Sequence, residues 1–394
     1  MKVVQLNAVC TGSTGKICMA ISRLLTEEGI ENHILYADGS ATGSAEGPYM
    51  TRKEIRLQAL RSRVLGNYGF NSKAATKRLI AKLESISPDI VHLHNIHGHN
   101  CNLDLLFSWL KEKKVRVFWT FHDCWAFTGY CTHFVEQGCE KWKTGCKHCS
   151  QRKRFSWFFD RSSVLYEKKK ELFAGLDLTV ITPSKWMAEL VRQSFLKDCP
   201  ILVINNGIDL SIFKSCPGVF RKSRGLEDKR IILGVASGWN DKKGLDSFIA
   251  LSEMLDERYV CVLVGTNDQV DQRLPERIIS IHRTHDQQEL AEIYSDADVF
   301  FNPTKEDTYP TVNMEAMACG TPVVTYRTGG SPEIVGDCGF VTEHDLDAAK
   351  AAIEQAIEQA QALRERCLKK AESFDQTDRF REYVRLYTEE KEIL

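Results

Sequence analysis

Short runs of apolar, β-branched residues alternate along the chain with longer segments of helical periodicity. In the first half, the runs that predict strands lie at residues 3–7, 32–36, 90–94, 115–121, 178–182 and 202–205. Amphipathic segments at 16–28 and 185–194 predict two of the helices between them. Because strands that alternate with helices are typical of βαβ units, this half is predicted to be an α/β domain with a mostly parallel sheet.

The alternation starts again after a polar segment at residues 211–227, which its prolines and glycines mark as a linker. The strands predicted after it lie at residues 230–236, 259–265, 278–282, 299–302 and 322–326. We therefore predict two Rossmann-like, doubly wound domains, at residues 1–210 and 228–375. Residues 347–394 read as almost entirely helical, and the last helix, at 376–394, is predicted to pack back on the first domain.

Composition agrees with two soluble domains and excludes some partners. The chain has 394 residues, of which 43% are hydrophobic and 27% charged. A net charge of −1 gives no electrostatic basis for binding nucleic acid. Met1 and Lys2 lead directly into the first strand, and we find no apolar run of about 18 residues, so a cytoplasmic location is expected.

One segment of the second half carries the most specific chemistry. A predicted strand ends at Asn302, and a helix is predicted to begin near Pro310, because proline fits a first helical turn. The backbone amides expected to hold an anion such as a diphosphate are those of Thr311, Val312 and Asn313. Asp307 precedes this helix and Glu315 lies on its second turn, so carboxylates that can accept hydrogen bonds from hydroxyls flank the anion site.

This segment resembles the donor-binding motif of family 4 retaining glycosyltransferases with the GT-B fold, in which seven residues separate two acids. The resemblance implies that Glu315, as the second acid, holds the ribose of a nucleotide sugar. It implies that the first acid contacts the transferred sugar. Asp307 stands where the family has glutamate, and Glu306 is one residue earlier, so both remain candidates. Further resemblances at 183–209 and 329–333 extend over nearly the whole chain and imply an active site in a cleft between two Rossmann-like domains.

Positive charge for the departing phosphates is expected after the first strand of the second domain. The family usually has an arginine and a lysine there, and Lys243, which precedes Gly244, matches the lysine. The arginine position falls near Ser237 without an arginine close by, so Lys242 or Arg283 are candidates to replace it. The resemblance implies that these cations act without a catalytic metal.

The loop after the first strand contains Gly12 and Gly15. A phosphate-binding P-loop would need glycine at position 10 and serine or threonine at position 17, but the chain has Cys10 and Ile17. The resemblance implies instead a glycine loop whose backbone approaches the donor phosphate and the acceptor.

Histidines and an aspartate follow two other strands of the first half. His92 and His94 lie on the same side of their strand, so at least one can enter the cleft, and His97 and His99 follow. The resemblance places His94 near the reacting sugar and Asp123 at another position lining the cleft. We therefore predict that His94 and Asp123 orient the acceptor while the departing phosphate takes the proton. Zinc binding by the four histidines is the competing interpretation.

A cysteine-rich insertion at about 124–150 stands apart from the other cysteines. Its four closely spaced cysteines are Cys131, Cys139, Cys146 and Cys149. Four thiolates satisfy tetrahedral zinc, so a structural zinc site is predicted, with redox-active thiols or an iron–sulfur cluster as alternatives. The insertion resembles that of exopolysaccharide glycosyltransferases of the colanic-acid type.

Two basic segments suggest a membrane partner. Residues 51–82 carry many lysines and arginines against the single acid Glu54, and residues 152–159 combine basic with aromatic side chains. Such segments can rest on anionic lipid at the inner face of the cytoplasmic membrane, where a lipid-linked acceptor would be found. The alternative is an ordinary solvated helix face.

Together with these features, the resemblance implies a retaining hexosyltransferase of family 4 type. Its donor would be a nucleotide sugar, with UDP favoured over GDP, and its acceptor a saccharide or lipid-linked saccharide in surface polysaccharide biosynthesis. The alternatives are a catalytically silent module that binds sugar nucleotides, an epimerase of sugar nucleotides on the GT-B fold, and a polymerase resembling glycogen synthase.

Overall fold

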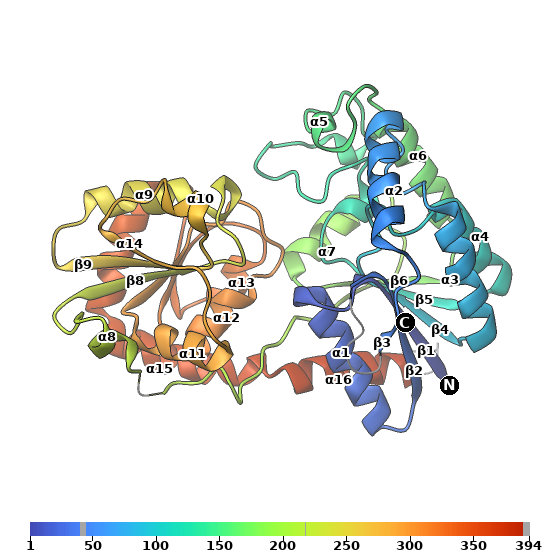
Figure 1. Cartoon of the computed structure of the whole chain (residues 1–394). Coiled ribbons are helices and arrows are strands. Elements are labelled where there is room, and N and C mark those ends of the chain that lie inside the picture. The colour runs from blue at the N-terminus through green and yellow to red at the C-terminus, as the bar shows by residue number, and fades with distance from the viewer. Residues whose placement is uncertain (40–44, 217, 389–394) are drawn as a thin grey trace. The chain divides into compact units, whose positions relative to one another are not determined.

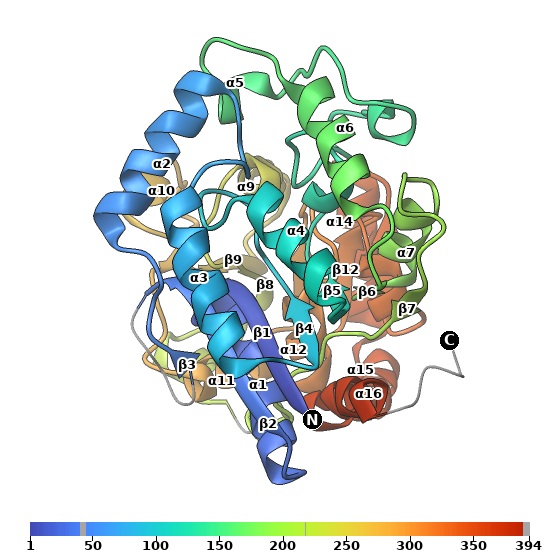
Figure 2. The same ribbon diagram turned by 90° about the vertical axis from the view of Figure 1, so that its right-hand side faces the viewer.

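The computed structural model describes residues 1–39, 45–216 and 218–388 and divides them into two compact units (Figures 1 and 2). The first unit contains Met1–Asn205 and the described residues from Phe380 on, and the second contains Asn206–Arg379. Each unit has its own parallel β-sheet with helices packed on it. The predicted fold, two Rossmann-like domains, is confirmed.

The first unit is built on a sheet whose strands are β1 (Lys2–Val9), β2 (Glu31–Asp38), β3 (Ala45–Glu46), β4 (Ile90–Leu93), β5 (Arg116–Thr120), β6 (Leu178–Thr182) and β7 (Ile201–Val203). They pair in the order β3-β2-β1-β4-β5-β6-β7, every pair parallel. Its helices are α1 (Gly12–Glu27), α2 (Arg52–Leu65), α3 (Lys73–Ile86), α4 (Leu103–Lys113), α5 (Arg152–Phe155), α6 (Ser162–Phe173), α7 (Lys185–Arg192) and the part of α16 (Gln376–Thr388) from Phe380 on.

The second unit has the strands β8 (Arg230–Val235), β9 (Tyr259–Val264), β10 (Ile278–Ile281), β11 (Val299–Asn302), β12 (Val323–Tyr326) and β13 (Gly339–Thr342). Their order is β10-β9-β8-β11-β12-β13, again entirely parallel. Its helices are α8 (Phe220–Ser223), α9 (Leu245–Met254), α10 (Asp268–Asp271), α11 (Gln287–Asp296), α12 (Thr311–Ala318), α13 (Ser331–Val335), α14 (Leu346–Glu358) and α15 (Ala360–Ala371).

Burial explains why the apolar runs form central strands. Val3, Val4 and Leu6 of β1 are buried, as a strand in a parallel sheet covered on both faces requires. The C-terminal helix contributes to the same core, because Phe380 and Tyr383 of α16 belong to the cluster that contains Val3.

Most predicted elements agree with the structure, and the differences have local causes. The two strands not predicted are β3, which has only two residues, and β13, none of whose four residues is fully buried, so neither gives a clear apolar run. The segment expected to be a linker, 211–227, packs on the second unit: Phe213 and Phe220 are buried in a core cluster of that unit, and α8 lies within the segment. The expected helix from 376 ends at Thr388 in the structure; residue 217 of the linker and residues 389–394 lie outside the described residues.

The strand orders place a switch point in each sheet. The chain runs from β1 to β2 and β3 on one side and then returns to β4 on the other, and β8 and β11 repeat this pattern. Ligands of doubly wound sheets bind outside the carboxyl ends of the strands at such points. The loops after β1, β4, β8 and β11 are therefore the places to examine. Among the described residues, no helix is both long enough and apolar enough to cross a membrane.

Candidate functional site

In the second unit, the loops after β8 and β11 are joined by two ion pairs. Lys242 pairs with Glu306, and the Nζ atom of Lys243 lies 2.8 Å from Oδ2 of Asp307. The two lysines end a 3-10 turn after β8, and the two acids follow β11, so four charged groups meet at the switch point of this sheet.

The close approach of these loops depends on a glycine. Gly244 has φ of +78°, and a Cβ atom there would lie 2.3 Å from the carbonyl oxygen of Pro303. Asn240 fixes the turn from the other end, because its Oδ1 accepts hydrogen bonds from the backbone N–H groups of Lys242 (3.0 Å) and Lys243 (3.2 Å). The sequence Lys243-Gly244 is thus required for the ion pairs, not only for the turn.

The two acids differ in what remains available for a ligand. The side chain of Glu306 is 2% exposed, and its Oε1 is buried without a hydrogen-bond partner among the described residues. Asp307 is 21% exposed, and its second oxygen, Oδ1, accepts a hydrogen bond from the Tyr309 amide at 3.3 Å. Leaving a buried carboxylate oxygen unsatisfied costs about 1–3 kcal/mol or more, so Glu306 is the acid that a ligand hydroxyl would stabilise.

Helix α12 begins one residue later than the proline pattern implied. Pro310 is its N-cap and Thr311 its first residue, so the amides of Thr311 and Val312 belong to the unbonded first turn. The Asn313 amide differs from expectation, because it donates to the Pro310 carbonyl at 3.2 Å. Its side chain offers a donor instead: Oδ1 accepts from Asn302 Nδ2 at 2.8 Å, while Nδ2 is buried without a partner among the described residues.

Glu315 lies on the second turn of α12, half-buried, as predicted from the sequence. Its Oε2 accepts a hydrogen bond from the Tyr294 hydroxyl at 3.2 Å. Burial, together with the charge of Glu315, holds the pKa of Tyr294 well above its usual value, so this hydroxyl stays a donor. Tyr294 therefore positions Glu315, a role that the sequence did not reveal.

A third unsatisfied group lies in the glycine turn at 329–331. Gly330 donates its N–H to the Thr308 carbonyl at 3.0 Å, so the turn packs on the loop that carries the acids. The hydroxyl of Ser331, at the start of α13, is buried with no partner among the described residues. Polar groups of this kind mark places where a ligand or water is expected.

In the first unit, Gly12 and Gly15 lie in the first turn of α1, not in a loop before it. A Cβ atom on Gly15 would lie 2.4 Å from the carbonyl carbon of Cys10, so glycine lets the helix start against the end of β1. The N-terminus of α1 consequently lies at the switch point of this sheet, as an anion-binding helix would require.

His94, at the end of β4, is held by other side chains. Its Nε2 lies 3.2 Å from Oε1 of Gln5, and its Nδ1 lies 3.1 Å from Nε2 of His122. Burial lowers the pKa of His94 well below its usual value and that of His122 to about 4, so both rings are neutral at pH 7. A neutral ring has one N–H, which His94 donates to Gln5 while it accepts from His122.

His92 lies deeper and is a core residue. Its Nε2 contacts the hydroxyl of Thr120 at 2.8 Å, and its Nδ1 contacts the hydroxyl of Tyr387 from α16. Burial, followed by the charge of His122, lowers the pKa of His92 to about 3. Of the two histidines predicted to share a side of the strand, His94 is the one that lines a pocket.

That pocket lies within the first unit, beyond the ends of β4 and β5. His94, His97, His122 and Asp123 are among its lining residues. His97 Nε2 donates to Asp123 Oδ2 at 2.9 Å, and the Trp125 amide donates to Asp123 Oδ1 at 2.8 Å. Burial raises the pKa of Asp123, but the charge and hydrogen bond of His97 outweigh it and hold that pKa below its usual value. The structure thus brings His94 and Asp123 together and adds His97 as the partner of the acid.

A buried lysine that the sequence did not single out lies under this pocket. Lys169 of α6 is fully buried, and its Nζ donates to the carbonyls of Trp125 (2.6 Å) and Thr128 (2.9 Å). Burial lowers the pKa of Lys169 to about 7, although the nearby Cys146 and Asp123 favour its charged form. It connects α6 to the cysteine-rich insertion.

The four cysteines of the insertion pack on one core cluster. Cys131 and Cys149 have their sulfurs 4.0 Å apart, close to the roughly 3.8 Å that a tetrahedral site with Zn–S bonds of about 2.3 Å requires. Among the described residues no third ligand atom lies within 4.8 Å of both sulfurs. The structural zinc site stays a prediction.

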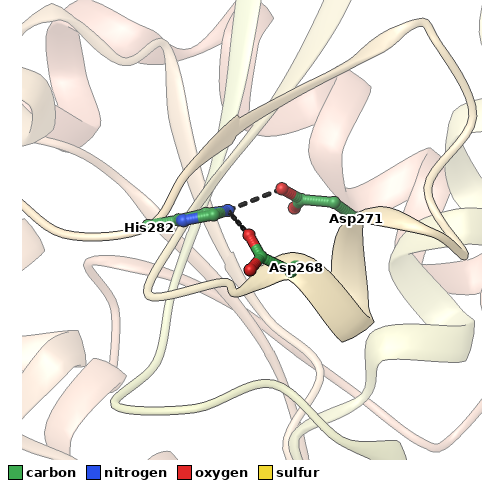
Figure 3. Close-up of side chains that lie close together, drawn as sticks. All are labelled: Asp268, Asp271 and His282. Carbon is green, nitrogen blue, oxygen red and sulfur yellow. Dashed lines mark hydrogen bonds and ion pairs between the residues drawn. The ribbon is translucent and has the colours of Figure 1, made fainter.

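Only one group of three potential metal ligands occurs among the described residues, formed by Asp268, Asp271 and His282 (Figure 3). His282 Nε2 lies 2.6 Å from Asp271 Oδ2 and 3.9 Å from Asp268 Oδ1. Hydrogen bonds from Ser280 and His282 lower the pKa of Asp271, so an exposed ion pair accounts for the arrangement. The histidines at 92–99 do not form such a group.

Comparisons with known proteins agree with this organisation. The model of Glycosyltransferase Family 4 matches residues 14–212, and that of Glycosyl transferases group 1 matches residues 219–374. WcaC of Escherichia coli (strain K12), named as a colanic acid biosynthesis glycosyl transferase, is 22% identical over 92% of both chains.

A second relative is the N,N'-diacetylbacillosaminyl-diphospho-undecaprenol alpha-1,3-N-acetylgalactosaminyltransferase of Campylobacter jejuni. It is 27% identical over 38% of this chain and 42% of its own. Among solved structures, HepE of Anabaena in complex with UDP matches with a TM-score of 0.70 and 15% identity, over 98% of this chain and all of that one.

Proposed function

Because the chain belongs to glycosyltransferase family 4, we propose that it transfers a hexose from a nucleotide sugar, favouring UDP, to a saccharide or lipid-linked saccharide with retention of configuration. The single observation that carries the donor part is the convergence of charged and unsatisfied polar groups at the switch point between β8 and β11. The resemblance to WcaC supports a place in surface polysaccharide biosynthesis.

The donor would exchange partners with the ion pairs that join the two loops. Lys242 and Lys243 are each about one-third exposed, so both can turn to the diphosphate, with Lys242 supplying the charge of the arginine that the family usually has. The first-turn amides of Thr311 and Val312 would bind the same anion. Glu315, oriented by Tyr294, would accept hydrogen bonds from the ribose hydroxyls.

We assign contact with the transferred sugar to Glu306 in preference to Asp307. Glu306 has a buried oxygen without a partner among the described residues, whereas both oxygens of Asp307 accept hydrogen bonds. A sugar hydroxyl would satisfy that oxygen. The unsatisfied Asn313 Nδ2 offers a donor in the same loop–helix region.

In the first unit, the acceptor would lie in the pocket lined by His97 and Asp123. Both ring nitrogens of His94 are engaged, so His94 would act mainly by holding the wall of that pocket. In the transfer, the acceptor oxygen bonds to the anomeric carbon, the bond from that carbon to the phosphate oxygen breaks, and the departing phosphate takes the acceptor's proton. No enzymatic nucleophile is invoked.

Thermal stabilisation by nucleotides tests the donor site. The purified chain is titrated with UDP, GDP, UDP-glucose and GDP-mannose, and the stabilisation at a ligand concentration of about one hundred times Kd should be roughly 2.7 kcal/mol. We expect Lys243→Met to lose the response to UDP. Glu306→Gln should keep the response to UDP but lose the additional stabilisation that UDP-glucose gives through its sugar.

Lys222→Met, which removes a lysine from α8, is the matched control and should respond like the parent chain. A folded parent chain that responds to no nucleotide sugar refutes the donor site. A nucleotide response without turnover of any donor would instead support the catalytically silent module. Equal losses of UDP and UDP-glucose binding in Glu306→Gln would refute the assignment of Glu306.

A further inference from the structure

The exposed apolar side chains of this chain are not scattered. Among the described residues, six of the eleven large hydrophobic side chains that are exposed belong to two short segments, residues 57–65 and 157–159: they are Leu57, Leu60, Leu65, Trp157, Phe158 and Phe159. Three consecutive aromatic side chains are 47%, 62% and 55% exposed, and such a patch on a soluble chain marks an interaction site.

The two segments adjoin, although about ninety residues separate them in the sequence. The Trp157 amide donates to the Arg63 carbonyl at the end of α2 at 2.7 Å, and Tyr130 donates its hydroxyl to the Gly66 carbonyl at 2.9 Å. Figures 1 and 2 both draw α2 next to α5, the short helix that leads into the aromatic residues. We call α2 together with residues 152–159 the α2–α5 surface.

The backbone of the aromatic segment is fixed while its side chains point outward. Arg152 Nη1 donates to the Phe158 carbonyl at 2.9 Å, and the Phe159 amide donates to Ser156 Oγ at 3.2 Å. A segment with these bonds does not need exposed aromatic side chains to hold its shape. The fold therefore does not explain why all three rings are exposed, and their exposure indicates a surface that binds a partner.

The charge of this surface identifies the partner. The whole chain has a net charge of −1, yet the α2–α5 surface carries eight lysines and arginines against one acid. That acid, Glu54, is engaged by Arg78 at 2.7 Å and by the capping box at the start of α2. Basic side chains among exposed leucines and aromatic rings are the chemistry of an interface with anionic lipid, where rings enter the headgroup region and cations meet phosphate.

We propose that the α2–α5 surface docks the first unit on an anionic lipid bilayer. Leu57, Leu60 and the three aromatic residues enter the headgroup region, and the basic side chains lie at its surface. Stable anchoring generally takes two signals, and the structure supplies two by joining the basic, leucine-bearing helix α2 to the aromatic segment.

The surface also adjoins the pocket of the first unit. Phe155 of α5 contacts Tyr68 with ring centroids 5.2 Å apart, Tyr68 contacts Trp125 at 6.2 Å, and Trp125 lines the pocket with Asp123. A lipid-linked acceptor held at the membrane would thus meet the pocket close to the bilayer. This last step rests on the proposed function, whereas docking on lipid does not.

Flotation with vesicles tests the docking. The full chain is mixed with vesicles of phosphatidylcholine containing 30% phosphatidylglycerol, or of phosphatidylcholine alone, and floated at 0.1 M and 0.5 M salt. We expect association with the anionic vesicles only, weakened at high salt, with a loss of about fivefold for each basic charge removed. The variant K53E/R56E/R61E should stay in solution, and W157S/F158S/F159S should bind at least tenfold more weakly.

The matched control is V219S/M254S, which removes two exposed apolar side chains of the second unit and should float like the parent chain. Trp157→Phe gives a second readout that keeps an aromatic ring in the surface: it should still float, but with less of the blue shift of tryptophan fluorescence that vesicles cause in the parent chain, because Trp157 is the exposed tryptophan. Failure of the parent chain to float overturns the proposal, as does flotation of both patch variants at parental level. Self-association that W157S/F158S/F159S abolishes, without lipid binding, would assign the surface to a second copy. The donor titration is independent of each outcome.

Discussion

The buried histidine His92 gives a prediction whose size follows from its surroundings. It is fully buried, its two ring nitrogens contact Thr120 and Tyr387, and its pKa in the folded chain is lowered to about 3. In the unfolded chain its pKa returns to about 6.5. As the pH falls below 6.5, the unfolded state takes up a proton that the folded state cannot take, so the free energy of unfolding decreases.

Between pH 7.5 and pH 5.0 this difference is worth about 2 kcal/mol for one histidine, since each pH unit below the unfolded pKa contributes about 1.4 kcal/mol. At pH 5.0 the folded state is still neutral at His92, so none of the effect is offset. His92→Gln keeps groups that can bond Thr120 and Tyr387 but does not titrate. Between pH 7.5 and pH 5.0, the free energy of unfolding of the first unit should therefore fall by about 2 kcal/mol less in His92→Gln than in the parent chain.

Urea unfolding at the two pH values measures this difference. Six of the seven tryptophans lie in the first unit and Trp239 in the second, so fluorescence in a Trp239→Phe background reports the first unit.

The variant His97→Gln serves as the contrast to His92→Gln. Burial alone would lower the pKa of His97, but the charge and hydrogen bond of Asp123 outweigh burial and raise that pKa. The stabilising pair of His97 with Asp123 is therefore fully present below the pKa of the unfolded chain. It is lost as the pH rises through the pKa of His97 in the folded chain. His97→Gln should therefore steepen the loss of stability in acid. Equal pH dependence in His92→Gln and the parent chain, within about 0.5 kcal/mol, would refute the reasoning.

Three further outcomes are expected. Asp123→Asn should lower the pKa of His97, seen in an NMR titration of its ring protons, and an unchanged value would contradict the pairing. Gly244→Ala should abolish UDP binding while lowering stability by a few kcal/mol, because its Cβ would meet the Pro303 carbonyl; unaltered UDP binding would show that the loops can separate without loss. Purified chain should retain one zinc per molecule, and Cys131→Ser with Cys149→Ser should release it; a metal-free chain that is fully stable would exclude the structural site.

The sequence predicted the sheets better than the contacts between loops. Strands such as β6 and β11 have the predicted bounds, because a continuous apolar run leaves few other interpretations. Lys243 and Glu315 could be singled out as candidates from the sequence, because the spacing of Lys243 from its glycine and of Glu315 from the helix start is local. The pairing of Lys242 with Glu306 was not found, because it joins residues 64 apart, and only the packed loops show which acid keeps a free oxygen.

Buried polar residues were the main omission. Lys169 stands between Lys168 and Lys170, so in sequence it looks like part of a solvated helix face, yet it is fully buried. Gln5 gave a weak signal as a polar residue in an apolar strand, and it proves to hold His94. In both cases the partner is a backbone carbonyl or ring on a distant segment, which no local pattern encodes.

The charges at the donor site imply an order of affinities that follows from the structure. Lys242 and Lys243 are already paired with the carboxylates of Glu306 and Asp307, so a diphosphate alone would add negative charge to a pair of loops in which these two cations are balanced by two acids. The hydroxyls of the sugar in a nucleotide sugar change this balance. A sugar hydroxyl that donates to a carboxylate frees the paired lysine for phosphate, and it can also satisfy the buried oxygen Glu306 Oε1. A nucleotide sugar should therefore bind more tightly than its nucleoside diphosphate, in contrast to sites where phosphate contacts dominate. Calorimetry with UDP-glucose and UDP can measure the ratio, and tighter binding of UDP in the parent chain would show that the sugar leaves the carboxylates unsatisfied.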